Sequence, residues 1–272
     1  MTILAASPEE AVATITDGTC LLLPREGAGV AMTATRALLR RGVKRLSLVA
    51  VPTSGLQADL LVGAGCVAEI EAAGVSLGEY GRAPRVAAAI VAGTLTFRDT
   101  TCPAVYARLQ AAEKGVPFMP LRGLIGSDVL RYRPDWRVID NPFAQNDEIV
   151  LLPAQTADIA LFHAPLADRY GNVWIGRERE LMLMAHAARA TIVTVEEIVS
   201  DDLLKDPVRA PATLANLYVT ALACAPRGAW PLPLPGRYPA DEAHLSEYAS
   251  LARTSEGFNR YIAAFVNDRR AA

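Results

Sequence analysis

The sequence lacks the features that most directly reveal a membrane or nucleic-acid partner. No uninterrupted run of about 18 apolar residues occurs, so we expect no transmembrane helix. The first residues lack the basic head and long apolar run of a signal peptide. The 27 basic residues are scattered and are outnumbered by 29 acidic ones, so no basic stripe exists to bind nucleic acid. We therefore expect neither a membrane nor a nucleic-acid partner.

Cysteine and histidine are also scarce. The four cysteines form no C-x-x-C pair, so we expect buried, reduced thiols and a cytoplasmic location. The three histidines are isolated, with no i, i+4 pair, so we predict no metal site. No serine or cysteine stands in a G-x-S-x-G elbow, which leaves a hydrolase triad without a nucleophile. The four cysteines are Cys20, Cys66, Cys102 and Cys224, and the three histidines are His163, His186 and His244.

Apolar residues make up 51% of the chain and charged residues 21%, which is enough to bury a substantial core. Short β-branched runs alternate with longer helical stretches, a pattern that favours β-α-β units and a parallel sheet. Strands are expected at 20–24, 46–51, 60–65, 116–119, 148–153, 159–164 and 191–195, and helices at 30–41, 102–114, 182–190 and 241–266. The sequence therefore predicts a Rossmann-like, doubly wound α/β fold with helices on both faces of an open, mostly parallel sheet.

We expect a single α/β domain over 1–272, with a Pro-rich extended segment and a C-terminal helix in 225–272. Five prolines fall between 225 and 239, after which helical spacing resumes. No repeat of fixed period and no low-complexity tract interrupts the chain. A chain of 272 residues suits one large α/β domain.

The glycine cluster Glu26-Gly27-Ala28-Gly29 lies between an expected strand and an expected helix. Ligands of open α/β sheets bind beyond the carboxyl ends of strands, where glycine lets the backbone approach them. The third glycine of a dinucleotide fingerprint is replaced by Met32, so that motif is not supported. A tight strand-to-helix turn is the alternative. Glu26 could attack an acyl-CoA to form an anhydride, but a solvated turn glutamate is the preferred interpretation.

Other acids and one histidine stand near strand ends. Asp99 precedes an expected helix, where it could be an N-cap or a pocket carboxylate; spacing alone favours the cap. His163 ends an apolar run and could form an acid–base pair with Asp168, although a core or strand-end histidine is preferred. Glu196 and Glu197 follow another strand, so either could face a site, and at least one is expected in a solvated turn.

The second half of the chain carries its most specific pattern. The run Ala167-Asp168-Arg169-Tyr170-Gly171-Asn172-Val173-Trp174-Ile175-Gly176 is followed by Met184-Ala-His-Ala-Ala-Arg-Ala190 and then by Thr191-Ile-Val-Thr-Val-Glu-Glu-Ile-Val199. This order resembles the A subunits of family I CoA-transferases, in particular the glutaconate CoA-transferase branch. Leu60–Gly65, Gly115–Arg122 and Glu256-Gly257-Phe258 resemble further family segments, so that the resemblance covers nearly the whole chain.

The resemblance implies a subunit that pairs with a homologous B subunit, whose glutamate attacks the acyl-CoA. Substrate or CoA contacts are then expected from Gly27, Ala28, Gly29 and Arg122. Family members of this branch often carry a glutamate sixteen residues before the G-x-P-F segment, and counting back from Gly115 reaches Asp99. That count makes Asp99 a candidate catalytic residue, and Glu26 is a second candidate. Gly171 and Asn172 are expected to shape a turn.

Three departures from the family pattern stand out. The first loop reads Pro24-Arg-Glu-Gly-Ala-Gly29 instead of a G-G turn, Asp99 replaces a glutamate, and Arg227 stands where a histidine is expected. We predict an A subunit that moves CoA from an acyl-CoA to a carboxylic acid, with the CoA thioester as substrate and no tightly bound cofactor. The alternatives are a subunit of a hydrolase that cleaves a carbon–carbon bond in a cyclic acyl-CoA, and a non-catalytic acyl-CoA-binding or structural subunit.

Overall fold

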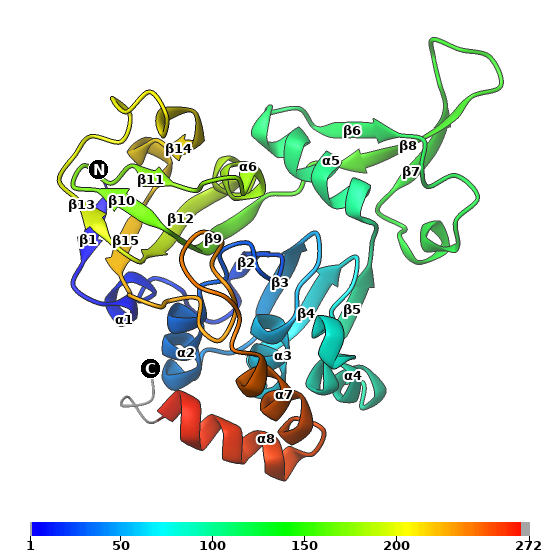
Figure 1. Cartoon of the computed structure of the whole chain (residues 1–272). Helices are drawn as coiled ribbons and strands as arrows, with labels where there is room; N and C mark the ends of the chain where they lie inside the picture. The colour runs from blue at the N-terminus through cyan, green and yellow to red at the C-terminus, as the bar shows by residue number, and fades with distance from the viewer. Residues whose placement is uncertain (1, 268–272) are drawn as a thin grey trace.

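A computed structural model describes residues 2–267, and an eight-stranded sheet forms its centre (Figure 1). The strand order is β1-β15-β12-β9-β2-β3-β4-β5, and every neighbouring pair runs parallel. Strands β2 to β5 form one half of the sheet, and β9, β12 and β15 form the other half, with β1 at its outer edge. The direction in which successive strands are added therefore reverses between β2 and β9. The strands are β1 (Ile3–Ala5), β2 (Cys20–Pro24), β3 (Leu46–Val51), β4 (Val67–Ala72), β5 (Thr96–Asp99), β9 (Ala157–Ala164), β12 (Ala188–Val195) and β15 (Ala221–Cys224).

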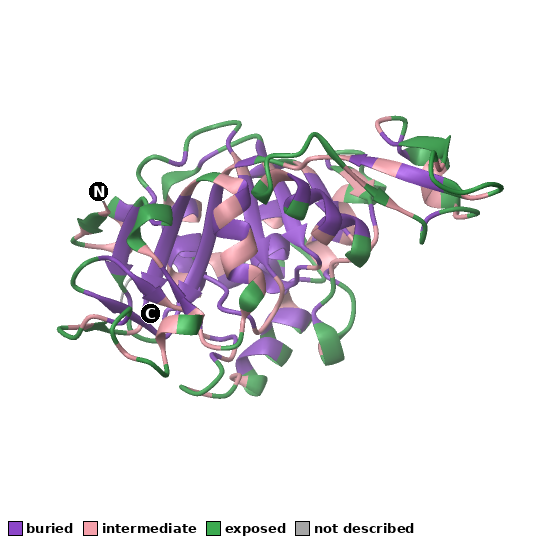
Figure 2. Ribbon diagram, turned by 90° about the horizontal axis from the view of Figure 1, so that it is seen from above, coloured by how far each residue is buried: buried purple, intermediate pink, exposed green. Residues whose placement is uncertain are grey.

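Helices cover both faces of this sheet, as the continuous apolar runs predict. In β2, Leu21 and Leu23 pack in the cluster that contains α2 and α3, whereas Leu22 packs in the cluster that contains α5 and α6. Figure 2 shows the strands as the most buried layer of the molecule. The predicted open, mostly parallel α/β sheet is therefore confirmed. The helices are α1 (Pro8–Ala11), α2 (Met32–Arg41), α3 (Leu56–Gly63), α4 (Pro84–Val91), α5 (Cys102–Glu113), α6 (Arg179–Ala187), α7 (Glu242–Leu251) and α8 (Ser255–Ile262).

Two expected elements differ from the structure. The run 60–65 was expected as a strand but lies in and just after α3, so that prediction is wrong. Leu56 to Val62 are all buried, and a helix buried all round shows no amphipathic period that would distinguish it from a buried strand. The helix expected at 182–190 begins earlier and ends at Ala187, because residues 188–190 already pair with β9 as part of β12.

A three-stranded antiparallel sheet forms a lobe that projects from the body (Figure 1, upper right). The inner side of this lobe packs on α5, where Trp136 and Leu152 meet Ala104 and Ala107. A short 3-10 segment, η2, connects two of its strands. The elements are β6 (Phe118–Leu121), η2 (Asp128–Tyr132), β7 (Arg137–Asp140) and β8 (Glu148–Pro153).

A second small sheet contains part of the most specific sequence pattern, the run 167–176. Asp168 is fully buried and accepts hydrogen bonds from the amides of Tyr170, Asn172 and Leu203. Gly171 has a φ of +89°, a conformation that favours glycine, so the predicted turn is confirmed. Asp168 is thus a structural residue and does not pair with a histidine. The strands, in the order β13-β10-β11-β14, are β10 (Leu166–Asp168), β11 (Val173–Trp174), β13 (Ile198–Val199) and β14 (Thr213–Leu214).

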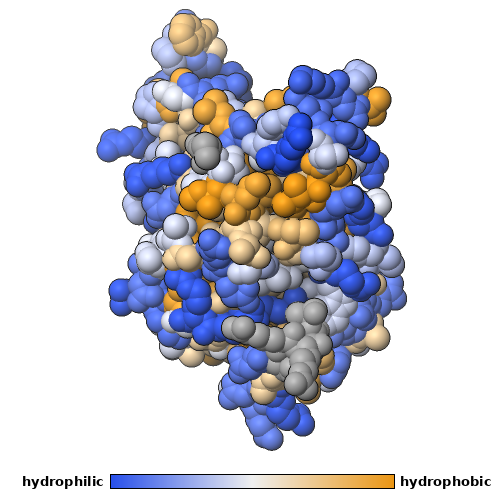
Figure 3. Space-filling view, turned by 90° about the vertical axis from the view of Figure 1, so that its left-hand side faces the viewer, coloured by the Kyte–Doolittle hydropathy of each residue, from blue (hydrophilic) through white to orange (hydrophobic). Residues whose placement is uncertain are grey.

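After β15 the chain runs through 225–241, a segment that we call the strap, before α7 and α8. The strap contains hydrogen-bonded turns, such as those closed by Trp230 and Arg237, so the expectation of an extended segment is wrong for much of its length. The helix expected over 241–266 is therefore two helices, followed by a π-helical turn at Ala263–Asn267. Within residues 2–267, no helix is long and apolar enough to cross a membrane. An apolar band covers the side of the molecule that carries β1 (Figure 3), where Ile3 and Leu4 lie exposed on the edge strand of the sheet.

Candidate active site

Two cavities flank the loop 25–29, which follows β2 at the point where the strand order reverses. Open α/β sheets bind their ligands at this place, beyond the carboxyl ends of the strands. The His163 cavity has a volume of 380 Å³ and the Glu26 cavity one of 490 Å³. The His163 cavity is lined by Gly29, His163, Pro165, Trp174, Ile175, Gly176, Arg177, Glu178, Leu181, Val208, Ala212, Leu234, Pro235 and Gly236. The loop thus contributes Gly29 to one cavity and Glu26 and Gly27 to the other.

The backbone of this loop needs glycine at two positions. Gly27 and Gly29 have φ values of +79° and +77°. Gly29 also lies against β9: its carbonyl accepts a hydrogen bond of 2.6 Å from the His163 amide, and a Cβ at this position would be 2.1 Å from the His163 carbonyl oxygen. Within residues 2–267, the N–H groups of Gly27 and Gly29 donate no hydrogen bond, whereas the Ala28 amide donates to the Arg25 carbonyl. Two loop amides therefore remain available as donors beside the two cavities.

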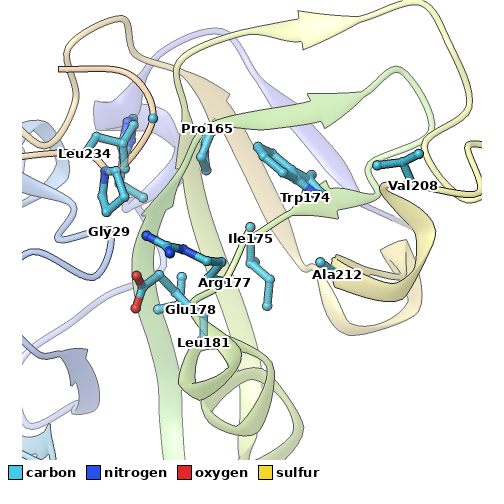
Figure 4. A pocket seen from close by; sticks show the side chains of 14 residues that line it. Gly29, Pro165, Trp174, Ile175, Arg177, Glu178, Leu181, Val208, Ala212 and Leu234 are labelled. Carbon is cyan, nitrogen blue, oxygen red and sulfur yellow. The ribbon is translucent and has the colours of Figure 1, made fainter.

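The His163 cavity has a polar end and an apolar end (Figure 4). Arg177 extends toward Gly29, with the carboxylate of Glu178 nearby. Glu178 is bound to Arg25, whose Nη2 lies 2.5 Å from Glu178 Oε2 and whose Nε lies 2.6 Å from Glu180 Oε1. Arg177 forms no such pair within the described part of the chain.

The opposite end of the cavity is formed by Trp174, Ile175, Val208 and Ala212 (Figure 4). These side chains come from β11, from the turn that follows it, and from the loop that leads into β14. None of them carries a charge, so this end offers contact only to apolar groups apart from the indole N–H of Trp174.

His163 is fully buried in the wall of the cavity and uses both ring nitrogens. Its Nε2 lies 2.7 Å from Glu196 Oε1 and its Nδ1 lies 2.8 Å from Thr194 Oγ1. Burial lowers the pKa of His163 despite its contact with Glu196, so the ring is neutral. A neutral ring has one N–H, and a carboxylate only accepts, so Nε2 donates to Glu196 and Nδ1 accepts from the Thr194 hydroxyl. The alternative pair with Asp168 does not form, because Glu196 takes that place, and the preferred interpretation of His163 as a core histidine near a strand end is confirmed.

Glu196 also fastens the strap. Its carboxylate accepts hydrogen bonds from the amides of Arg227 (2.7 Å) and Gly228 (3.2 Å) and from the Tyr238 hydroxyl (2.7 Å). Burial alone would raise the pKa of Glu196, but the hydrogen bonds from His163, Tyr238 and the Arg227 amide outweigh it and lower the pKa to about 2. The Glu197 side chain is 57% exposed, and its Oε2 lies 3.6 Å from Arg237 Nη2. Glu196 is thus largely buried and Glu197 is solvated, in line with the expectation that at least one of the two acids lies in a solvated turn.

The strap separates the two cavities. Residues Leu234 to Gly236 line the His163 cavity, whereas Leu232 and Pro233 line the Glu26 cavity. Gly228 must be glycine because a Cβ there would lie 2.4 Å from His163 Cε1. Both cavity shapes therefore depend on how the strap is held against β9 and β12.

Glu26 is half-buried and its carboxylate is hydrogen-bonded to the backbone, so the prediction of a solvated turn glutamate is wrong. Its two carboxylate oxygens lie 3.0 and 3.1 Å from the Leu56 amide at the start of α3. Gly55 provides the space, since a Cβ there would lie 1.4 Å from Glu26 Oε2. Burial, with a smaller contribution from the charge of Asp59, raises the pKa of Glu26 to about 7, against the hydrogen bond from Leu56.

Asp99 lies exposed at the carboxyl end of the edge strand β5. Its carboxylate accepts a hydrogen bond of 3.0 Å from the next amide, that of Thr100. The N-cap of α5 is Thr101, so Asp99 does not cap the helix as spacing alone favoured. Asp99 is not among the residues that line the His163 or Glu26 cavities.

Below Asp99, a buried ion network joins the sheet to the lobe. Arg133 is 1% exposed and donates to the Asp99 carbonyl (3.1 Å), to Glu71 Oε1 (3.0 Å) and to both carboxylate oxygens of Asp135. Arg108 of α5 binds the same Glu71 oxygen. The end of β5 is thereby fixed to a residue that follows η2 of the lobe.

Arg122 lies in the lobe, apart from the residues with which it was expected to act. Its Nε and Nη2 lie 2.7 and 2.6 Å from the two carboxylate oxygens of Asp147. This pairing holds the pKa of Arg122 above its usual value and the pKa of Asp147 well below its usual value. It lines a separate cavity of 440 Å³ on the lobe, together with Phe118 and Phe143. The structure therefore brings Glu26, Gly27 and Gly29 together but places Asp99 and Arg122 elsewhere.

The sequence analysis missed Arg177 and the pairing of His163 with Glu196. Arg177 gives no signal of its own, because an arginine after a glycine is ordinary on a surface. The pairing of His163 with Glu196 could have been found, since both follow strands that end at the same edge of a parallel sheet. Within residues 2–267, no group of three His, Cys, Asp or Glu side chains could hold a metal ion.

Known proteins share this architecture. The model of the family described as coenzyme A transferase matches residues 5–217. An uncharacterized protein of Archaeoglobus fulgidus is 35% identical over 269 residues, which are 96% of this chain but 58% of that protein. The A subunit of glutaconate CoA-transferase from Acidaminococcus fermentans is 31% identical over 250 residues, 85% of this chain and 77% of that protein.

Solved structures agree with these matches. The crystal structure of glutaconate coenzyme A-transferase from Acidaminococcus fermentans superposes with a TM-score of 0.88 and 28% identity, over 96% of this chain and 88% of that one. A variant of the decarboxylase AibA/AibB superposes with a TM-score of 0.82 and 34% identity, over 97% of this chain and 100% of that one. The likeness to A subunits expected from the sequence is therefore confirmed.

Proposed function

The chain belongs to the coenzyme A transferase family, and on this premise we propose that it is the A subunit of a heteromeric enzyme that moves CoA from an acyl-CoA to a carboxylic acid. The observation that carries this proposal is the His163 cavity beside the free amide of Gly29, at the carboxyl edge of β2 and β9. The substrate is a CoA thioester and the location is the cytoplasm. The four cysteines, all free of disulfides, accord with that location.

The nucleophile comes from a homologous B-type partner in this proposal. Its glutamate attacks the thioester carbonyl to give an acyl-glutamyl anhydride and CoA thiolate, and the thiolate then forms a glutamyl-CoA thioester as the first acid leaves. The acceptor acid reverses these two steps. The present chain holds the acyl group in the His163 cavity and directs the Gly29 amide at developing negative charge.

A carbon–carbon bond hydrolase is the second candidate, and Asp99 is the carboxylate that it would use. An exposed carboxylate at the end of β5, with its backbone fixed by Arg133, could activate a water molecule for attack on a cyclic acyl-CoA. The similar decarboxylase structure also indicates that this architecture accommodates chemistry other than CoA transfer. In the transferase, Asp99 would contact a substrate or a water molecule without being essential.

The two candidates differ in isotope exchange. This chain is to be produced together with a homologous B-type chain, and exchange of labelled acetate or succinate into acyl-CoA is measured. The transferase is expected to show exchange and ping-pong kinetics, because a covalent enzyme intermediate forms. A hydrolase shows no exchange. Complete absence of exchange with a full set of carboxylic acids would contradict the transferase proposal.

Variants of Asp99 assign its role in the same complex. The Asp99→Asn change is expected to lower transferase activity by less than about tenfold, but to lower hydrolysis by about 10²–10⁴-fold if the residue is a general base. Asp128→Asn is the matched control, because Asp128 is an exposed aspartate whose carboxylate pairs only with Arg131. If Asp99→Ala keeps full activity in the complete complex, Asp99 has no catalytic part.

A further inference from the structure

We propose that the His163 cavity binds the chain of a short monocarboxylic acid, with the carboxyl carbon near Gly29 and Arg177 and the apolar tail toward Trp174 and the buried side chain of Ile175. This inference rests on the proposed function and names the class of acid that the function leaves open. It also makes Arg177 a specificity-determining residue, which the sequence pattern alone did not indicate.

Arg177 provides the charge at the polar end of the cavity. Its side chain extends toward Gly29 (Figure 4) and forms no hydrogen bond or ion pair with another residue within 2–267, whereas its backbone carbonyl accepts from the Arg179 amide. The neighbouring carboxylate of Glu178 is already bound to Arg25 at 2.5 Å. The guanidinium is therefore available to the carboxylate of an acceptor acid, and the Gly29 N–H to the oxygen of the corresponding thioester.

The other end of the cavity excludes a second charge. Ile175, which is buried, lines this end together with Trp174 and Ala212, and the exposed Val208 lies at its rim. Among the described residues of the lining, only Arg177 and Glu178 carry a formal charge. A dicarboxylic acid would place its distal carboxylate in this apolar end, where it would lose water without gaining a cationic partner. The cavity therefore selects a tail without charge.

The size of the cavity limits the length of the tail. Its 380 Å³ lies near the lower end of the range of roughly 300–1,000 Å³ that ligand pockets cover. Trp174 and the strap residue Leu234 enclose it. A compact aliphatic acid is expected to fit, whereas a fused-ring acyl group is not.

The first experiment compares two acids of the same length in the complex with the B-type partner. Hexanoate is expected to accept CoA with a kcat/KM about 100-fold higher than adipate, because only adipate must bury a second carboxylate. Equal or better use of adipate would overturn the inference while leaving CoA transfer intact. If neither these nor other acids accept CoA, the proposed function fails, and the binding experiment below still tests the cavity.

Two substitutions test the two ends of the cavity. Val208→Arg places a cation at the apolar end and is expected to raise kcat/KM for adipate by at least about tenfold relative to hexanoate. Val208 is 84% exposed, so the fold tolerates the change.

Arg177→Gln is expected to raise KM for hexanoate about tenfold. Arg179→Gln is its matched control, since Arg179 is an exposed arginine two positions away that does not line this cavity. Unchanged KM in Arg177→Gln would remove Arg177 from the site.

Binding can be followed without transfer, through the fluorescence of Trp174 in the full-length chain. Hexanoate is expected to change the emission saturably, and adipate to do so only at about 100-fold higher concentration. Trp174→Phe should abolish the change, although Trp136 and Trp230 remain. A saturable signal that persists in Trp174→Phe, or the absence of any signal with hexanoate, would contradict the inference whatever the transfer assay shows.

Discussion

At residue scale, Glu26 is a carboxyl group held where its charge is unfavourable. It lies under the first loop against the Leu56 amide, and its pKa is raised from 4.5 to about 7, first of all by burial. Between these two values the unfolded chain releases the proton while the folded chain retains it, so stability falls as pH rises. A shift of this size corresponds to about 3 kcal/mol of unfolding free energy. That contribution is fully present below pH 4.5 and lost once the pH passes about 7.

Glu26→Gln tests this shift, because the amide oxygen can still accept from Leu56 but nothing titrates. Urea unfolding at pH 5 and pH 8 is expected to show the wild type losing up to about 3 kcal/mol relative to the variant between the two values. Glu79→Gln is the control, since Glu79 is an exposed acid in the same cavity. A difference between wild type and Glu26→Gln that does not change with pH would show that Glu26 is ionised throughout.

At element scale, a carboxylate that directly follows β12 binds two backbone amides of the strap. Glu196 accepts from the amides of Arg227 and Gly228, and a glutamine would present only one acceptor oxygen to the same donors. In Glu196→Gln we therefore expect these two amides to exchange hydrogen about tenfold faster or more. Amide exchange measured by NMR or mass spectrometry reports this directly.

Glu197→Gln is the matched control for the strap, because Glu197 is the adjacent acid and is mostly exposed. It should leave exchange in the strap unchanged. If Glu196→Gln also leaves it unchanged, the Pro-rich segment holds its position without Glu196. Other contacts would then hold the strap, among them the hydrogen bonds from Arg36 to the Trp230 carbonyl and from Arg237 to the Pro165 carbonyl.

Elements of the sheet could be predicted because β2, β3, β9 and β12 are continuous apolar runs, which burial on both faces requires. The helix α3 could not, since its side chains are buried all round and its N-terminus meets a carboxylate from a different loop. In the site, the Gly27–Gly29 turn could be predicted, because glycine adopts positive φ values easily and because the turn follows a strand. The environment of Glu26 does not, because the space for it is created by Gly55, 29 positions away (55 − 26).

At the scale of the whole molecule, the described residues contain no activated nucleophile beside the His163 cavity. His163 uses both ring nitrogens in the wall, Glu178 is bound to Arg25, and the cavity lining holds no cysteine or serine. Glu26 lines the other cavity, and with a pKa of about 7 much of it is protonated, and therefore a poor nucleophile, at neutral pH. The covalent step of the proposed transferase is therefore assigned to the B-type partner.

The isolated chain is therefore expected to bind acids without transferring CoA. It should show the Trp174 response to hexanoate, because the polar and apolar ends of the His163 cavity both lie within one chain. Exchange of labelled acid into acyl-CoA should stay at background and rise by about 10³-fold or more when the B-type chain is added, as expected for restoring a missing nucleophile. Exchange by the isolated chain that disappears in Glu26→Gln would instead make Glu26 the nucleophile, and the present chain would then carry out the covalent step itself.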